Sequence, residues 1–61
     1  MTPHQFLVSM RIAEARRLLA AGLAPAEVAA MTGFADQSHL TRRFRSRIGF
    51  TPGRYRDSAG R

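Results

Sequence analysis

The arginines at positions 42, 43, 45 and 47 form the densest group of charged side chains in the sequence. Four guanidinium groups within six residues repel one another at helical spacings of three and four residues, and no acidic residue lies among them. Phosphate groups would relieve this repulsion, because they pair with arginine through charge-assisted hydrogen bonds. The group therefore predicts binding of a phosphate-bearing polyanion.

The residues that could act as acids, bases or metal ligands form no such group. They are scattered along the chain, at His4, Glu14, Glu27, Asp36, His39 and Asp57. The two histidines are 35 positions apart, with no partner at metal-binding spacing. The absence of cysteine excludes a thiol nucleophile and a cysteine-ligated zinc site, and it fits a reducing compartment. We therefore expect no enzyme activity, no catalytic residue, no metal and no other cofactor.

Length and net charge narrow the class of partner. Sixty-one residues make one small domain with few core side chains. Ten basic residues, all arginine, against four acidic ones give a net charge of +6, which favours nucleic acid first and an anionic membrane second. No stretch has the roughly 18 apolar residues of a membrane span, and the N-terminus lacks a signal-peptide pattern. The sequence thus favours a cytoplasmic protein, at the nucleoid.

Proline and glycine divide the chain into helices and leave no room for a sheet. A helix tends to begin with proline in its first turn and to end at glycine. This pattern predicts helices at residues 3–21, 25–31, 37–48 and 52–57, with Thr2 and Asp36 as N-caps and a frayed end from Asp57 to Arg61. The predicted fold class is all-α, a small helical bundle in one domain covering residues 1–61.

The first predicted helix has an apolar stripe that contains one charged residue. The inward residues at helical spacing are Leu7, Val8, Ile12, Ala15, Leu18 and Leu19. Arg11 falls inside this stripe. Its position predicts either an ion pair with Glu27 or Asp36, or an exposed place at the edge of the stripe.

The second and third predicted helices complete the core. The second helix must pack on its neighbours, through Val28 and Ala29, because isolated helices below about 12 residues are marginal in water. Gly33 supplies a tight turn, after which Phe34 can plug the core. The buried edge of the third helix consists of Leu40, Phe44 and Ile48.

A short helix, a tight turn and a longer helix with a basic outer face are typical of a helix-turn-helix, here over residues 25–48. The first helix of such a unit braces the second, which lies in the major groove of double-stranded DNA with its N-terminal residues at base edges. The helical period turns outward Ser38, His39, Arg42, Arg45 and Ser46. Arg43 and Arg47 flank this face, and Gln37 stands in the first turn, where an amide can reach an adenine edge.

Nearly the whole chain, from residue 2 to about 57, resembles the C-terminal half of the DNA-binding domain of AraC/XylS-family transcriptional regulators. The resemblance is specific because its motifs occur together and in register. They are Arg11-Ile12, Ala15, Leu18-Leu19, Gly22, Glu27-Val28-Ala29, Gly33-Phe34, Ser38, Leu40, Arg42, Phe44, Gly49, Thr51-Pro52 and Tyr55-Arg56. Ala24 departs from the hydroxyl residue often found before the second helix.

In that family, two helix-turn-helix units are joined by a long helix, commonly behind an effector-sensing or dimerisation domain. The resemblance makes residues 3–21 the linker helix, 25–48 the second helix-turn-helix and 52–57 a short C-terminal helix. Thr2-Pro3 with Phe6 repeats the pattern of Thr51-Pro52 with Tyr55, and so matches the end of a first unit that this chain lacks. The resemblance thus implies a fragment that needs a missing N-terminal helix-turn-helix and sensing domain, or a homo-oligomer, for strong selectivity.

The resemblance also assigns roles to residues. It places base contacts at Gln37, Ser38, His39 and Arg42. Arg42 is suited to guanine, whereas Ser38 and His39 occupy positions at which the family varies, so no operator sequence transfers. The candidates for phosphate contacts are Arg43, Arg45, Arg47 and Arg54. Arg56 is a further candidate for a phosphate contact, but a structural role is favoured for it, in which it anchors the C-terminal turn against an acidic residue.

Two other interpretations of the sequence remain. The chain could be a protein-interaction module or a truncated remnant without specific DNA binding, with RNA polymerase as a possible partner. A cationic amphipathic segment on a membrane is disfavoured, because interfacial helices keep a continuous apolar face without the Gly-Phe turn and caps found here.

Overall fold

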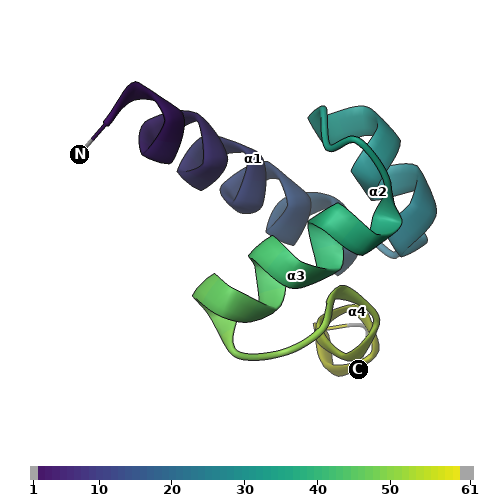
Figure 1. The fold of residues 1–61 in the computed structure, drawn as a ribbon. Coiled ribbons are helices and arrows are strands. Elements are labelled where there is room, and N and C mark those ends of the chain that lie inside the picture. The colour runs from purple at the N-terminus through teal and green to yellow at the C-terminus, as the bar shows by residue number, and fades with distance from the viewer. Residues whose placement is uncertain (1, 60–61) are drawn as a thin grey trace.

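The structure, a computed structural model, describes residues 2–59 and contains four helices and no strand within them. The helices are α1 (Pro3–Ala20), α2 (Pro25–Thr32), α3 (Gln37–Ile48) and α4 (Pro52–Ala59). Figure 1 shows α3 crossing α1, with α2 at the upper right, α4 at the lower right and the N-terminus at the free end of α1 on the left. The all-α fold class is confirmed.

The observed helix bounds differ from the predicted ones mainly at the C-terminus. Helix α3 spans the predicted residues, α1 ends one residue earlier than predicted and α2 one residue later. Helix α4 continues through Asp57 and Ser58 to Ala59, so the fraying predicted from Asp57 onward is wrong for these three residues. Residues 60 and 61 lie outside the described residues.

Hydroxyl and carboxylate caps fix the starts of three helices. The hydroxyl of Thr2 accepts a hydrogen bond from the backbone N–H of Gln5 at 3.1 Å, and the Gln5 side-chain oxygen accepts one from the N–H of Thr2 at 3.0 Å. Asp36 caps α3 by accepting from the N–H of His39. The hydroxyl of Thr51 accepts from the N–H of Arg54 at 3.2 Å. The repeated Thr-Pro pattern therefore has the same local role at α1 and α4, as a side-chain cap.

Helix α2 begins without such a cap, because Ala24 has no side chain that can accept a hydrogen bond. Its end is sharply defined by Gly33, whose φ of 85° lies in the left-handed region that glycine adopts without strain. The N–H groups of Gly33 and Phe34 both bond to the carbonyl of Ala29. This turn directs Phe34 into the core, where it is 5% exposed, as predicted.

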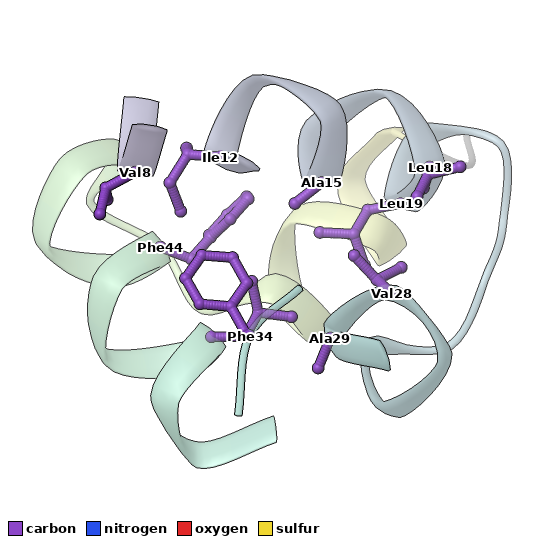
Figure 2. Close-up of a cluster of buried hydrophobic side chains, with 10 residues drawn as sticks. Val8, Ile12, Ala15, Leu18, Leu19, Val28, Ala29, Phe34 and Phe44 are labelled. Atoms are coloured by element: carbon purple, nitrogen blue, oxygen red, sulfur yellow. The ribbon is translucent and has the colours of Figure 1, made fainter. Parts of the chain in front are cut away.

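The core lies where α1, α2 and α3 meet. Figure 2 shows the rings of Phe34 and Phe44 close to the side chains of Val8, Ile12 and Ala15 on α1. Ile48, which is predicted to face inward, is only partly buried at the edge. The buried hydrophobic residues all belong to the set predicted to face the core. They are Val8, Ile12, Ala15, Leu18, Leu19, Val28, Ala29, Phe34, Leu40 and Phe44.

One prediction for α1 is wrong, and one of the two alternatives for Arg11 is excluded. Leu7 does not face inward but is 43% exposed, because the core side of α1 is centred on Val8 and Ile12 and Leu7 lies off this line. Arg11 forms an ion pair with neither Glu27 nor Asp36. Its guanidinium instead lies against the turn glycine, so that a Cβ on Gly33 would stand 3.3 Å from Nε of Arg11.

Helix α4 is attached to both α3 and the end of α1. The ring of Tyr55 meets that of Phe44 edge to face, with centroids 5.5 Å apart, and the guanidinium of Arg16 lies 5.9 Å from the Tyr55 centroid. Arg56 donates from Nε to the carbonyl of Gly22 at 3.0 Å. Arg56 therefore anchors α4, as predicted, but the predicted acidic partner is wrong, because the guanidinium donates to a backbone carbonyl instead.

We predict that Gly33→Ala destabilises the domain by about 1–2 kcal/mol, because alanine is strained at this positive φ. The new methyl group would also displace Arg11. Urea denaturation measures the loss. Gly49→Ala serves as a control for strain alone, since its φ is 97° but a Cβ added there would meet no atom within 4 Å, and we expect it to cost less.

Gly53→Ala is a control for which the expected change in stability has the opposite sign. It lies in the first turn of α4, and a Cβ there would meet no atom within 4 Å. Gly53→Ala should leave stability unchanged or raise it by up to about 1 kcal/mol, since alanine is the better helix former. Equal effects of Gly33→Ala and Gly53→Ala would contradict the role given to the turn.

Candidate nucleic-acid interface

Helices α2 and α3, joined by the turn after Gly33, form the unit that presents the basic face. Helix α3 is held from behind by two fully buried side chains, Leu40 and Phe44. Phe44 also packs on Tyr55 of α4, so neighbouring helices on both sides fix the rotation of α3. The side of α3 opposite these residues is therefore presented to solvent in one defined orientation.

The arginines of α3 are exposed and have no acidic partner. Arg42, Arg43, Arg45 and Arg47 all lie on the surface, and none is within salt-bridge distance of a carboxylate in residues 2–59. The salt bridge found in this part of the chain joins Arg17 to Glu14 on α1. There the hydrogen bond from Arg17 lowers the pKa of the Glu14 carboxyl. The repulsion predicted from the sequence is thus not relieved within the described domain.

Two of these arginines have a structural reason to stand where they do. Arg45 and Arg47 lie in the last turn of α3, where cations interact favourably with the negative end of the helix dipole. Arg42 and Arg43 lie earlier in the helix and lack this benefit. The helix dipole therefore accounts for the positions of neither Arg42 nor Arg43.

Four side chains surround an open hollow on the outward side of α3. The lining residues are His39, Arg42, Arg43 and Ser46. Two of the predicted base-contact residues, His39 and Arg42, thus lie beside the predicted phosphate-contact residue Arg43. Gln37 and Ser38 are exposed in the first turn of the same helix and do not line this hollow.

His39 is less outward than predicted. It is half-buried, and its ring meets that of Phe34 edge to face, with centroids 5.3 Å apart and an interplanar angle of 88°. Its Nδ1 atom is buried without a hydrogen-bond partner in the described structure. Only the Nε2 side of the ring is therefore placed to reach a ligand. The contact with Phe34 covers the other side of the ring. Because Phe34 belongs to the turn and not to α3, this contact cannot be predicted from the helical period of α3.

Arg54 stands apart from the other predicted phosphate-contact residues. It lies on α4, is exposed, and its guanidinium is 5.3 Å from the ring centroid of Phe50 in the preceding loop. This cation–π contact limits the orientations of the side chain. Arg54 is thus held at the junction of α3 and α4.

The sequence did not indicate a second hollow, which lies between the first turns of α1 and the outer half of α3. Its lining residues are His4, Gln5, Val8, Arg43, Ser46 and Arg47. His4 and Gln5 are separated from the α3 residues by nearly forty positions, so only the crossing of the two helices brings them together. No local sequence signal could have found this group.

The described residues contain neither a candidate membrane-spanning helix nor a candidate metal site. None of the helices has the length and hydropathy that a membrane-spanning segment requires. Within residues 2–59, no three histidine or acidic side chains come together as a metal site would require.

Comparison with known proteins gives one family. A family model described as a helix-turn-helix domain, of the AraC type, matches residues 1–58. Transcriptional activator NphR from Rhodococcus is 43% identical over 61 residues, which cover 98% of this chain and 18% of NphR. Probable transcriptional regulator LumQ from Photobacterium leiognathi is 38% identical over 55 residues, covering 88% of this chain and 22% of LumQ.

A third relative is the uncharacterized HTH-type transcriptional regulator YbfI from Bacillus subtilis, 44% identical over 39 residues, which cover 64% of this chain and 14% of YbfI. The chain thus spans less than a quarter of the length of these relatives. No solved structure is significantly similar to it. The family match covers nearly the whole chain and agrees with the four helices and the turn at Gly33, and the chain belongs to the AraC-type family of helix-turn-helix domains.

Proposed function

We propose that α3 is a recognition helix that enters the major groove of double-stranded DNA, and that the chain thereby contributes to transcription regulation in a bacterium. The observation that carries this proposal is the face of α3, where four exposed arginines have no acidic partner in the described residues. Membership of a helix-turn-helix family supports it. The role is one of binding, without catalysis or a cofactor, and its place is with the DNA in the cytoplasm.

The proposed base contacts come from the first two turns of α3. Arg42 pairs with O6 and N7 of a guanine, the commonest specific contact of arginine, and Gln37 pairs with an adenine edge. Ser38 is exposed and can bond to several bases. His39 contributes at most the Nε2 side of its ring, because its Nδ1 faces inward.

The proposed phosphate contacts flank these base contacts. Arg43, Arg45 and Arg47 lie along α3, and Arg54 is held over Phe50 on α4. Such contacts set the position of a protein on the duplex and supply most of the sequence-independent affinity. A single recognition helix gives few contacts, so binding by this domain alone is weak, and its selectivity is limited to what those few base contacts supply.

We propose that strong selectivity requires further protein. The matched regions make up only 14% to 22% of the relatives, which leaves room for a first helix-turn-helix, a sensing domain and contacts with RNA polymerase in the whole regulator. A homo-oligomer would serve the same purpose, by bringing two recognition helices to one DNA site.

One observation favours the second candidate function, protein interaction. Phe6, Leu7 and Met10 are 57%, 43% and 55% exposed, and they lie together on the N-terminal half of α1. Exposed apolar groups of this kind are typical of interaction surfaces. The two functions are compatible, since this surface and the arginine face of α3 lie on different helices.

The proposal predicts a steep dependence of DNA binding on salt. About four phosphate contacts give a slope of log K against log salt near −3.6, which is a loss of about 150-fold in affinity between 50 and 200 mM salt. Fluorescence anisotropy with a labelled duplex measures it. Arg43→Ala should make the slope shallower by about 0.9.

Arg17→Ala is the matched control, since it removes the same charge from an exposed position on another helix. Binding that is independent of salt, or equal effects of the two substitutions, would count against α3 as the binding surface.

A further inference from the structure

The hollow between α1 and α3 is lined by residues of both helices, whereas the proposed function assigns DNA contacts only to α3 and α4. On the α3 side it is lined by Arg43, Ser46 and Arg47, and on the α1 side by His4 and Gln5. All five residues are exposed, and none of the lining residues is acidic. We call this hollow the α1–α3 groove.

The groove has a fixed floor and a fixed α1 wall. Val8 forms the floor and belongs to the core, being 6% exposed. The wall is fixed by the reciprocal hydrogen bonds between Thr2 and Gln5 at the start of α1. The groove is therefore held open by the packing and capping of the fold.

The groove is rich in hydrogen-bond donors. The capping interaction occupies the side-chain oxygen of Gln5, which leaves its amide NH₂ available to donate. Arg43 and Arg47 supply guanidinium donors, and Ser46 and His4 can each donate one hydrogen bond. Such a set matches an anion with several acceptor oxygens and disfavours a cation or an apolar ligand.

The position of the groove identifies which phosphate it fits. Arg43 and Ser46 line both this groove and the hollow that contains Arg42 and His39, so the two are adjacent. An anion in the groove is therefore next to the residues proposed to read bases. A phosphodiester of the DNA backbone lies beside the bases at the edge of the major groove, which fits this arrangement. A free phosphate would not require base-contact residues next to its site.

We propose that the α1–α3 groove binds a backbone phosphate of the DNA duplex that α3 reads, with His4 and Gln5 as additional phosphate contacts. This inference rests on the proposed function. The contact clamps one strand between two helices, and so fixes the angle at which α3 enters the major groove. It gives α1 a direct role in binding, besides its role in the core.

The substitution Gln5→Glu tests this groove without weakening the fold. Glutamate is a normal partner in a capping box and is favourable in the first turn of a helix, so the unfolding midpoint should be unchanged or raised. The same change replaces the amide donor with a carboxylate that repels phosphate. We expect binding of a labelled duplex at low salt to weaken about five- to tenfold, and the salt slope to become shallower by about 0.9.

Arg17→Gln is the control, since it lowers the net charge by the same amount at an exposed position on the same helix. It should weaken binding less than twofold. His4→Ala, which removes a donor without adding a charge, should weaken binding about two- to threefold. The proposal requires that Gln5→Glu and His4→Ala each weaken DNA binding more than Arg17→Gln does.

The outcomes separate the groove from the proposed function. Salt-dependent binding by the unmodified chain with equal effects of Gln5→Glu and Arg17→Gln would overturn the groove and leave α3 as the binding surface. No salt-dependent binding by the unmodified chain would overturn the proposed function and the groove together. A larger effect of Gln5→Glu at an undiminished unfolding midpoint would support both.

Discussion

Phe44→Ala should leave the domain largely unfolded at room temperature. Phe44 is fully buried and is the largest of the fully buried side chains. It lies between α1, α3 and α4, with its ring 5.5 Å from that of Tyr55. Truncation of a buried phenylalanine costs about 3–5 kcal/mol. A domain of this length has a total stability of about 3–9 kcal/mol, and so short a chain is expected near the low end because it buries little surface. At the low end of this range, one substitution removes most or all of the stability.

Circular dichroism at 222 nm during thermal and urea unfolding measures this loss. Phe44→Leu keeps most of the buried volume and should cost less than half as much. Phe50→Ala is the matched control for the same chemical change at a surface position, because Phe50 is 48% exposed. It should cost less than about 1 kcal/mol. A melting temperature for Phe44→Ala within a few degrees of that of the unmodified chain would contradict the proposed core.

The second large effect concerns selectivity. Arg42→Ala should reduce discrimination between the preferred duplex and a scrambled one by about 5- to 150-fold, equivalent to the 1–3 kcal/mol of a bidentate contact with guanine. Arg42 is exposed and takes no part in the core, so the substitution should leave stability nearly unchanged. Nonspecific binding should fall by only a few-fold, because one charge is lost among several.

A selection from a random DNA pool identifies the preferred duplex, and competition binding then measures the discrimination ratio. Arg45→Ala is the matched control within the same helix. As a proposed phosphate contact, it should weaken binding to both duplexes by similar factors. An unchanged ratio for Arg42→Ala would contradict its role as a base contact.

The helices of this fold are predictable because their ends have strong local signals. Pro3, Pro25 and Pro52 all stand at the first position of a helix, and Gly33 and Gly49 end α2 and α3 with positive φ. The end of α4 has a comparable signal, since Gly60 follows Ala59 directly in the sequence, and the prediction of a frayed end from Asp57 overlooks it. Packing of Tyr55 and Arg56, which the sequence does not reveal, attaches this helix to the rest of the domain.

The features that the sequence does not reveal depend on contacts between distant segments. Charge alone suggests an acidic partner for Arg11, whereas the structure places its guanidinium against Gly33. Helical position alone turns His39 outward, but Phe34 from the preceding turn covers one side of its ring. The wall that His4 and Gln5 add to the surface of α3 arises from the crossing of α1 and α3, which no periodic pattern encodes.

The exposed arginines and first-turn residues of α3 are the central element of the proposed function, and nuclear magnetic resonance tests them most directly. A short duplex is titrated into the ¹⁵N-labelled chain at low salt, and backbone and arginine side-chain shifts are followed residue by residue. Binding through α3 predicts that the largest changes fall between Gln37 and Arg47. Changes confined to the surface around Phe6 and Met10, or no change on α3, would contradict it.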